Sequence, residues 1–405
     1  MNEIDRTKIG YIPELEDCFD PGLKGFRYGL KVKGFWEKAE ITGVYRIKVY
    51  LIAKEDVKEC FLFAGRKNLF YVGCLKAGEE LKRSFYIHVG EIIPRYHHDV
   101  KRTEQVSITI ACDNFEKIEI LKIDVLRISE EAEVPMVFIA GDSTVTDQIS
   151  EMPYHPGGCY SSWGQDLSYY IGDCAAVDNQ AHCGLSTESF REEGHFSIIQ
   201  KAIKPGDYCL FQFAHNDQKL AHLQAKTGYR HNLLRFIHEI MEKGGLPVLV
   251  TPLGRNLWTG KEGYLDLLNE YAHEVNIIGE EMETPVIQLH DFSVAWMREQ
   301  GYLRNSAYFH PGDVTHTNEY GAYLFAGFVA AGLQKIAGDK LLIDKGHSLT
   351  FDFVPDHFQL DSCRIENENR NKTAEHREQF DAMEKSVENL ILSVNKAKIE
   401  AESLM

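Results

Sequence analysis

The sequence predicts an α/β protein. Its main part is expected to be a flavodoxin-like three-layer α/β/α sandwich with five parallel strands, preceded by an all-β sandwich domain and followed by a C-terminal helix. Short apolar runs alternate with helical stretches from Val134 onward, whereas before about residue 132 the apolar residues repeat with period two. After Thr373 the chain has neither Pro nor Gly. We therefore expect three units, at residues 1–132, 133–345 and 346–405.

The composition fits a globular protein and narrows the range of partners. A chain of 405 residues is too long for one small core. The net charge of −17 argues against nucleic acid and anionic membranes as partners, because both bind through clusters of Lys and Arg. No run of eighteen apolar residues exists, so no membrane span is expected. The N-terminus lacks the apolar stretch of a secretory signal and the nine cysteines show no Cys-x-x-Cys spacing, which favours a cytoplasmic location with free thiols.

The first unit has the pattern of antiparallel strands. Four segments alternate apolar and polar residues and are separated by Gly, Asn and Asp clusters: Val44–Ile52, Ser84–Val89, Val106–Ala111 and Ile118–Leu126. Such a pattern is typical of a β-sandwich. It resembles the galactose-binding-like sandwiches that precede some polysaccharide-acting enzymes. We expect a packing or dimerisation module in preference to a sugar-binding one.

The second unit alternates strands and helices, which predicts right-handed crossovers and a parallel sheet covered on both faces. The expected strands are Val137–Ala140, Ala175–Val177, Tyr208–Phe213, Pro247–Val250 and Val286–Leu289. The expected helices are Trp163–Ile171, Phe190–Ile203, Leu233–Lys243, Tyr264–Glu281 and Val294–Gln300. In a flavodoxin-like arrangement we expect the first of these strands to be central.

The last helix, from about Thr373 to Leu404, carries an apolar seam with alternating spacings of three and four residues. The seam consists of Phe380, Met383, Val387, Leu390, Val394, Ala397, Ala401 and Leu404. Two interpretations stay open: the helix lies on its own protein body, or it pairs with a second copy in a homodimer. The β-sandwich is the other candidate surface for a homodimer.

The first strand of the second unit leads directly into a candidate nucleophile. It is bounded by Pro135 and by Gly141-Asp142, which predicts a buried strand that ends in a tight turn bearing Ser143. Ligands of open α/β sheets bind at the carboxyl ends of the strands. Ser143 is therefore expected to face a binding crevice.

Two more candidate residues follow the next two strands. Gly184 stands behind the second strand, where a glycine lets the backbone approach a ligand and aim its N–H at an oxygen atom. Asn216 stands behind the third strand, and its side-chain amide can donate to a developing negative charge. Each residue alone is also typical of an ordinary turn, so the hypothesis depends on their combination.

Asp313 and His316 precede a helix that is expected to be capped by Thr317 or Asn318. At this spacing on one turn, the carboxylate can hold one imidazole N–H and leave the other nitrogen free to act as a base. A metal site is the alternative for this pair. No second cluster of His and carboxylate residues at ligand spacing stands beside it, which disfavours a metal.

A nucleophile, two oxyanion donors, a base and its orienter make up the set that acyl transfer requires. The Gly-x-Ser-x-Gly motif of α/β-hydrolases is absent, as are His-Glu-x-x-His and Gly-x-Gly-x-x-Gly. Four blocks resemble the signature blocks of the SGNH (GDSL-type) hydrolases: Gly141-Asp-Ser-Thr144, Gly184, Asn216-Asp217 and Asp313-Val-Thr-His316. Further segments are similar to the rhamnogalacturonan acetylesterase-like branch, family twelve of the carbohydrate esterases. They are Ala140-Gly-Asp-Ser-Thr144, Ser162-Trp-Gly-Gln165, the run from Asn179 to Phe190, and Asp313-Val-Thr-His-Thr-Asn318.

The resemblance covers about residues 134–340 and implies a role for each matching residue. Ser143 is the nucleophile, His316 is the general base, and Asp313 orients the imidazole. The oxyanion hole consists of the backbone N–H groups of Ser143 and Gly184 together with the side chain of Asn216. No cofactor and no metal is implied.

The activity implied by the resemblance is that of a serine esterase. It would remove O-acetyl groups from plant cell-wall oligosaccharides of the rhamnogalacturonan or pectin type through an acetyl-enzyme intermediate. Acetylated oligosaccharides are the expected partners, with no nucleic acid and no membrane. Two alternatives stay open: an SGNH esterase or lipase for other acyl esters, and a non-catalytic carbohydrate-binding protein.

Two positions depart from the family pattern. Ala214 stands where the family usually has Gly before His-Asn-Asp, and we expect the added methyl group to be tolerable. Leu185 stands where the branch usually has Arg between Gly and Ser. The loss of that cation alters the contacts available to an anionic sugar, so the polysaccharide is left open.

Overall fold

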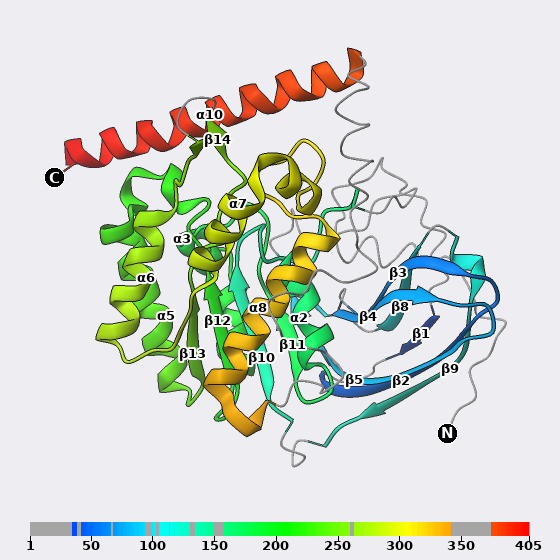
Figure 1. The fold of residues 1–405 in the computed structure, drawn as a ribbon. Coiled ribbons are helices and arrows are strands. Elements are labelled where there is room, and N and C mark those ends of the chain that lie inside the picture. The colour runs from blue at the N-terminus through cyan, green and yellow to red at the C-terminus, as the bar shows by residue number, and fades with distance from the viewer. Residues whose placement is uncertain are drawn as a thin grey trace.

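A computed structural model gives the architecture of the chain (Figure 1). The structure describes residues 35–38, 42–65, 68–93, 99–102, 105–112, 114–129, 134–148, 157–259, 263–341 and 374–404. A parallel sheet covered by helices follows two antiparallel sheets, and a long helix ends the chain. The predicted fold class is confirmed.

The parallel sheet has five strands, and its order is β11-β10-β12-β13-β16. The strands are β10 (Met136–Gly141), β11 (Ala176–Asn179), β12 (Tyr208–Gln212), β13 (Leu246–Val250) and β16 (Val286–Ile287). Counted along the chain this order is 2-1-3-4-5, as in flavodoxin-like sheets. The expectation that the first strand is central needs a correction, because β12 occupies the middle and β10 lies between β11 and β12.

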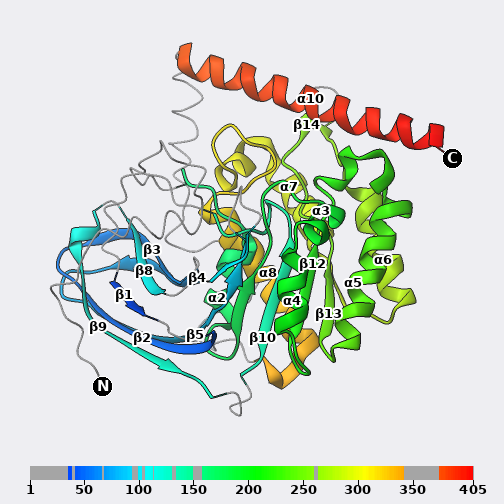
Figure 2. The same cartoon turned by 180° about the vertical axis from the view of Figure 1, so that it is seen from behind.

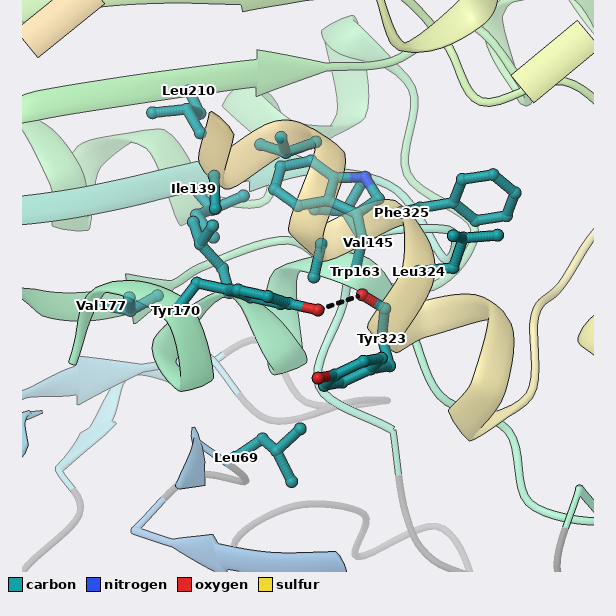
Figure 3. Close-up of a cluster of buried hydrophobic side chains, with 14 of the residues drawn as sticks. Leu69, Ile139, Val145, Trp163, Tyr170, Val177, Leu210, Tyr323, Leu324 and Phe325 are labelled. Carbon is teal, nitrogen blue, oxygen red and sulfur yellow. Dashed lines mark hydrogen bonds between the residues drawn. The ribbon is translucent and has the colours of Figure 1, made fainter. Parts of the chain in front are cut away.

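Helices cover both faces of this sheet. They are α2 (Trp163–Ile171), α3 (Thr187–Glu192), α4 (His195–Ala202), α5 (Arg230–Glu242), α6 (Asn269–Glu281), α7 (Leu289–Asn305) and α8 (Glu319–Ala337). Side chains alternate along β10, since successive residues of a strand point to opposite faces. Val137 and Ile139 join the core under α2 and α8, whereas Phe138 joins the core under α3 to α6. Figure 3 shows the first of these cores, in which the hydroxyl of Tyr170 donates to the carbonyl of Tyr323 at 2.9 Å.

Three of the expected helices differ clearly from the observed ones, and the one expected at Val294–Gln300 is the longer α7, Leu289–Asn305. The single helix expected at Phe190–Ile203 is divided into α3 and α4. The break falls at Gly194, whose φ of 91° is incompatible with a right-handed helix. The helix expected from Tyr264 begins only at Asn269, because Tyr264 belongs to the short strand β15 (Gly263–Tyr264), which pairs with β14 (Trp258–Thr259).

The first unit consists of two main antiparallel sheets, of order β1-β8-β3-β4 and β5-β2-β9, and a short β6-β7 pair. The strands are β1 (Phe35–Lys38), β2 (Gly43–Ala53), β3 (Val57–Ala64), β4 (Asn68–Leu75), β5 (Glu80–Val89), β6 (Glu91–Ile92), β7 (Lys101–Arg102), β8 (Gln105–Cys112) and β9 (Ile118–Arg127). A common apolar core lies between the two sheets, which is the packing of a β-sandwich.

The sandwich and the parallel-sheet unit also share a core. Phe61 and Leu69 of the sandwich belong to the same cluster of buried side chains as Trp163 of α2. Polar contacts cross the same boundary: the hydroxyl of Tyr320 donates to Glu59 Oε1 at 2.7 Å. The sandwich is thus packed firmly onto the parallel-sheet unit.

The C-terminal helix α10 (Ala374–Leu404) lies across the parallel-sheet unit, as two opposite views show (Figures 1 and 2). Val394 and Ala397 of the expected apolar seam are buried, with 1% and 3% exposure. Lys398 Nζ forms an ion pair with Glu270 Oε2 of α6 at 3.1 Å. These contacts place the helix on its own chain. The structure does not describe the side chains of three other seam residues, Phe380, Met383 and Leu404. A homodimer stays a prediction.

Among the residues that the structure describes, none of the helices combines the length and the apolar character needed to span a membrane. The seven cysteines in the same ranges are all free thiols.

Candidate active site

Ser143 lies on the turn that follows β10. Asp142 shapes this turn, because its Oδ1 accepts hydrogen bonds from the backbone N–H and the hydroxyl of Thr144 at 2.9 and 2.8 Å. A buried chain of hydrogen bonds supports the turn from below. Trp163 Nε1 donates to Gln212 Oε1 at 2.8 Å, and Gln212 Nε2 donates to Thr144 Oγ1 at 2.7 Å. The turn is therefore fixed by residues of α2 and of the neighbouring strand β12.

Ser143, His316 and Asp313 form a continuous hydrogen-bonded series. Ser143 Oγ lies 2.8 Å from His316 Nε2, and His316 Nδ1 lies 2.7 Å from Asp313 Oδ2. Because an ionised carboxylate only accepts hydrogen bonds, the imidazole proton belongs on Nδ1 and leaves Nε2 to accept the serine hydroxyl. Burial raises the pKa of Asp313, but the hydrogen bonds from His316 and from backbone N–H groups outweigh it and lower the pKa to about 2. The carboxyl group is thus ionised at neutral pH.

The loop that carries His316 is anchored by the two residues that follow it. Thr317 Oγ1 donates to the carbonyl of Ser161 at 2.6 Å. Asn318 caps α8, since its Oδ1 accepts from the backbone N–H groups of Tyr320 and Gly321 at 3.1 and 3.2 Å. This decides between the two caps expected from the sequence. The imidazole is consequently held by the start of α8.

Three possible hydrogen-bond donors face the space in front of Ser143. Gly184 adopts a φ of 83°, which favours glycine at this position. Within the described part of the chain, the backbone N–H groups of Ser143 and Gly184 have no acceptor. Asn216 Nδ2 donates to the carbonyl of Leu185 at 2.9 Å, and Lys219 Nζ donates to Asn216 Oδ1 at 3.1 Å. These two contacts fix the orientation of the amide and leave its second N–H for another acceptor.

Asp217 ties the loop of Gly184 to the loop of Asn216. Its Oδ1 accepts from the backbone N–H of Thr187 at 3.0 Å and from the Thr187 hydroxyl at 2.6 Å. The carboxyl group is fully buried, and this burial raises its pKa to about 7. Asp217 Oδ2 has no hydrogen-bond partner among the described residues, which suits a protonated carboxyl group. This buried acid therefore fixes the relative position of the two loops together with the hydrogen bond from Asn216 to Leu185.

Ala214 has an unusual backbone conformation for its residue type. Its φ is 122°, a region that residues with a Cβ atom rarely adopt, and its side chain is fully buried. The expectation that a methyl group is tolerable here was therefore incomplete. The methyl group is accommodated, but at the cost of backbone strain that a glycine would avoid.

A cavity of about 550 Å³ lies in front of the serine. All five residues singled out from the sequence line it: Ser143, Gly184, Asn216, Asp313 and His316. Sequence reasoning assigned no role to several other polar residues of its wall, among them Lys219, Arg255, Ser386, Asn389 and Ser393. Lys219 lies three residues after Asn216, whereas only the tertiary structure brings the other four to the cavity.

Two cations contribute to this wall. Arg255 is buried with 4% exposure, and burial lowers its pKa to about 10, so it stays charged at neutral pH. Its guanidinium contacts the Thr315 hydroxyl and donates to the carbonyl of His215 at 3.2 Å. Lys219, by contrast, has an exposed side chain that borders the cavity. The site is therefore locally positive in a strongly acidic chain.

Sequence and structure comparisons show which known proteins this chain resembles. No family model matches the chain. The rhamnogalacturonan acetylesterase RhgT of Bacillus subtilis (strain 168) is 33% identical over 213 residues, which are 49% of this chain and 90% of that protein. The probable rhamnogalacturonan acetylesterase YesY of the same organism is 29% identical over 208 residues, or 49% of this chain and 93% of that protein. The crystal structure of the Bacillus subtilis protein YxiM superposes with a TM-score of 0.48 at 23% identity, covering 76% of this chain and 81% of that one.

Proposed function

The chain belongs to the SGNH (GDSL-type) hydrolases related to rhamnogalacturonan acetylesterases, and on that premise we propose that it is a serine esterase for O-acetylated oligosaccharides of the rhamnogalacturonan or pectin type. One observation carries the proposal. The hydroxyl of Ser143 is hydrogen-bonded to the free nitrogen of an imidazole whose other nitrogen is held by Asp313, at the mouth of a cavity. This is the arrangement that activates a serine for attack on a carbonyl carbon.

The proposed reaction is a two-step acyl transfer. His316 Nε2 takes the proton of Ser143 as Oγ attacks the acetyl carbonyl, and the resulting imidazolium returns the proton to the departing sugar hydroxyl. Asp313 stabilises the imidazolium through Nδ1–H. Water then attacks the acetyl-enzyme by the reverse proton path and releases acetate. In both steps the negative charge on the carbonyl oxygen is met by the N–H groups of Ser143, Gly184 and Asn216.

The charge of the cavity supports an acidic saccharide. Leu185, at the position where related enzymes usually have Arg, buries its side chain with 4% exposure and offers only its carbonyl to Asn216. The positive charge at this site comes instead from Lys219 and Arg255. A sugar carboxylate that lies near the acetyl group would find an ammonium group within the same cavity. A neutral acetylated sugar would gain hydrogen bonds from it but no ion pair.

The test of the catalytic assignment is the variant Ser143→Ala. We expect it to lose measurable hydrolysis of p-nitrophenyl acetate and labelling by a fluorophosphonate, while its circular dichroism spectrum is unchanged. Full esterase activity in this variant would refute the assignment of the nucleophile. If the unmodified chain is neither labelled nor active, the catalytic assignment fails and the alternative of a non-catalytic carbohydrate-binding protein is favoured.

The substrate class is tested with two families of oligosaccharides. Acetate release from acetylated pectic oligosaccharides, which carry carboxylates, is compared with release from acetylated xylan oligosaccharides. Lys219→Gln is expected to raise KM for the pectic substrates several-fold more than for the xylan ones. Lys226→Gln, an exposed lysine outside the cavity, is the matched control. An equal effect on both substrates would refute the acidic saccharide. Rates on acetyl and octanoyl p-nitrophenyl esters test the rival preference for longer acyl groups.

A further inference from the structure

The geometry points to α10 as a wall of the substrate site: Ser386, Asn389 and Ser393 are specificity-determining residues that hydrogen-bond to hydroxyl groups of the acetylated saccharide. These three residues line the same cavity as Ser143 and His316. The inference rests on the proposed function and goes beyond it, because α10 lies outside the part of the chain that carries the catalytic motifs.

The position of α10 beside the cavity is fixed by packing. The helix packs on two short segments next to the site, η3 (Asp217–Lys219) and η4 (Ala221–Leu223). Its own residues Val394 and Ala397 are buried. The η3 segment directly follows Asn216 and includes Lys219. One side of the cavity is therefore formed by η3 and the loops of the sheet, and the other by the helix that rests on η3.

The three polar residues lie on one face of α10. Ser386, Asn389 and Ser393 are separated by three and four residues, a spacing that places side chains on a common stripe of an α-helix. Val387 and Leu390 also line the cavity and belong to the adjoining apolar seam. On the side of α10, the cavity is therefore lined by a polar stripe and by the apolar residues next to it.

The chemistry of this stripe suits a sugar. Each serine hydroxyl can donate and accept, and an asparagine amide offers two donors and an acceptor oxygen, so neutral hydroxyl groups can pair with any of them. The apolar border can cover the C–H face of a sugar ring. A long acyl chain would bury these three polar side chains without offering them hydrogen bonds, which is unfavourable.

Other faces of the same helix provide matched controls. Asn395 and Ser403 are exposed and do not border the cavity, and Leu392 is 66% exposed. An asparagine and a serine can thus be substituted on α10 away from the site. Such variants share any general effect on helix stability with the variants of the stripe.

The experiment uses the full chain with Ser386, Asn389 and Ser393 all changed to Ala, and Asn395→Ala with Ser403→Ala as control. For each protein, kcat/KM is measured for an acetylated pectic oligosaccharide and for p-nitrophenyl acetate. The loss of three hydrogen bonds is expected to lower the ratio of saccharide to aryl-ester kcat/KM by about tenfold or more, through KM for the saccharide. The control is expected to keep the ratio of the unmodified protein.

Several outcomes would overturn the inference. If the triple variant keeps the saccharide to aryl-ester ratio of kcat/KM, α10 does not contribute to recognition of the saccharide. An equal fall for both substrates means that the helix has only a structural role. A bulkier variant, Asn389→Trp, gives a second test, because it is expected to exclude the oligosaccharide more strongly than the aryl ester. If the unmodified protein hydrolyses neither substrate, the proposed function fails first. Hydrolysis of p-nitrophenyl acetate that depends on Ser143, together with an unchanged ratio, refutes the role of α10 alone.

Discussion

Asn216 Nδ2 donates to the carbonyl of Leu185 at 2.9 Å, which joins the loop behind β12 to the loop behind β11. The contact has two effects. It brings the amide of Asn216 beside Gly184, and it uses one of the two amide hydrogens while the other stays available. Asn216 is thus both a link between two loops and a candidate donor to the reacting oxygen.

Replacement of Asn216 by Ala is expected to lower kcat by about 10²–10³-fold, because it removes a donor that is already in place when the negative charge develops. KM should change much less, since the uncharged ester gains little from that donor. Steady-state kinetics on p-nitrophenyl acetate provide the measurement. A kcat within about threefold of the unmodified protein would remove Asn216 from the oxyanion hole.

Asp313→Asn is expected to keep the fold and to lower kcat on the order of 10³–10⁴-fold. An amide in place of the carboxylate can donate to Nδ1, which would move the imidazole proton to Nε2 and stop this nitrogen from accepting the Ser143 proton. Single-turnover hydrolysis of an aryl acetate measures the effect on acylation. An unaltered rate of acylation would show that another group orients His316.

Asp217 predicts a specific pH dependence of stability. Its folded pKa of about 7 lies above its ordinary value of 3.8. At a pH between these two values, the folded state therefore retains a proton that the unfolded state has lost. The stability that it contributes is therefore fully present below about pH 4 and is lost as the pH rises towards 7. In Asp217→Asn this dependence is absent. The difference in unfolding free energy between the two proteins should then fall by about 1 kcal/mol per pH unit in that window. Urea unfolding at several pH values measures it, and a constant difference would contradict the prediction.

Ala214→Gly is expected to stabilise the protein. Relief of a backbone strain of about 1–3 kcal/mol is opposed by the greater freedom of Gly in the unfolded chain, about 0.4–1 kcal/mol, and by the loss of a buried methyl group, about 0.8 kcal/mol. Because a φ of 122° lies far from the left-handed region that other residues tolerate, we expect the strain to prevail and the net gain to be about 1 kcal/mol.

The matched control for this change is Ala181→Gly. Ala181 is buried with 4% exposure in the loop after β11 and is not one of the described residues with positive φ. The same substitution there should destabilise the protein, since no strain is relieved. Urea unfolding of both variants at one pH tests the pair. A loss of stability in Ala214→Gly as large as in Ala181→Gly would show that position 214 is unstrained.

The sequence was most informative where local patterns determine structure. A short apolar strand followed by Gly-Asp predicted a turn that presents Ser143, and the structure has β10 end at Gly141. The period-two pattern before residue 132 predicted antiparallel strands, which are present in two sheets. In such segments the backbone preference and the burial pattern agree, so one sequence suffices.

The remaining features depend on contacts between distant segments. Nothing local marks Asn389 as a residue of the cavity, because its neighbours in sequence resemble ordinary solvent-facing residues. The strain at Ala214 likewise follows from the path of the chain after β12, which the residue type alone does not reveal.

The core that Phe61 and Leu69 share with Trp163 has a mechanical consequence. Trp163 also supports the turn of Ser143 through its hydrogen bond to Gln212. The sandwich is thereby connected to the catalytic turn through the shared core and α2. Heat that loosens the antiparallel sheets would remove part of the apolar core on which α2 packs. The first unit therefore stabilises the second by packing, and we expect the two units to melt cooperatively.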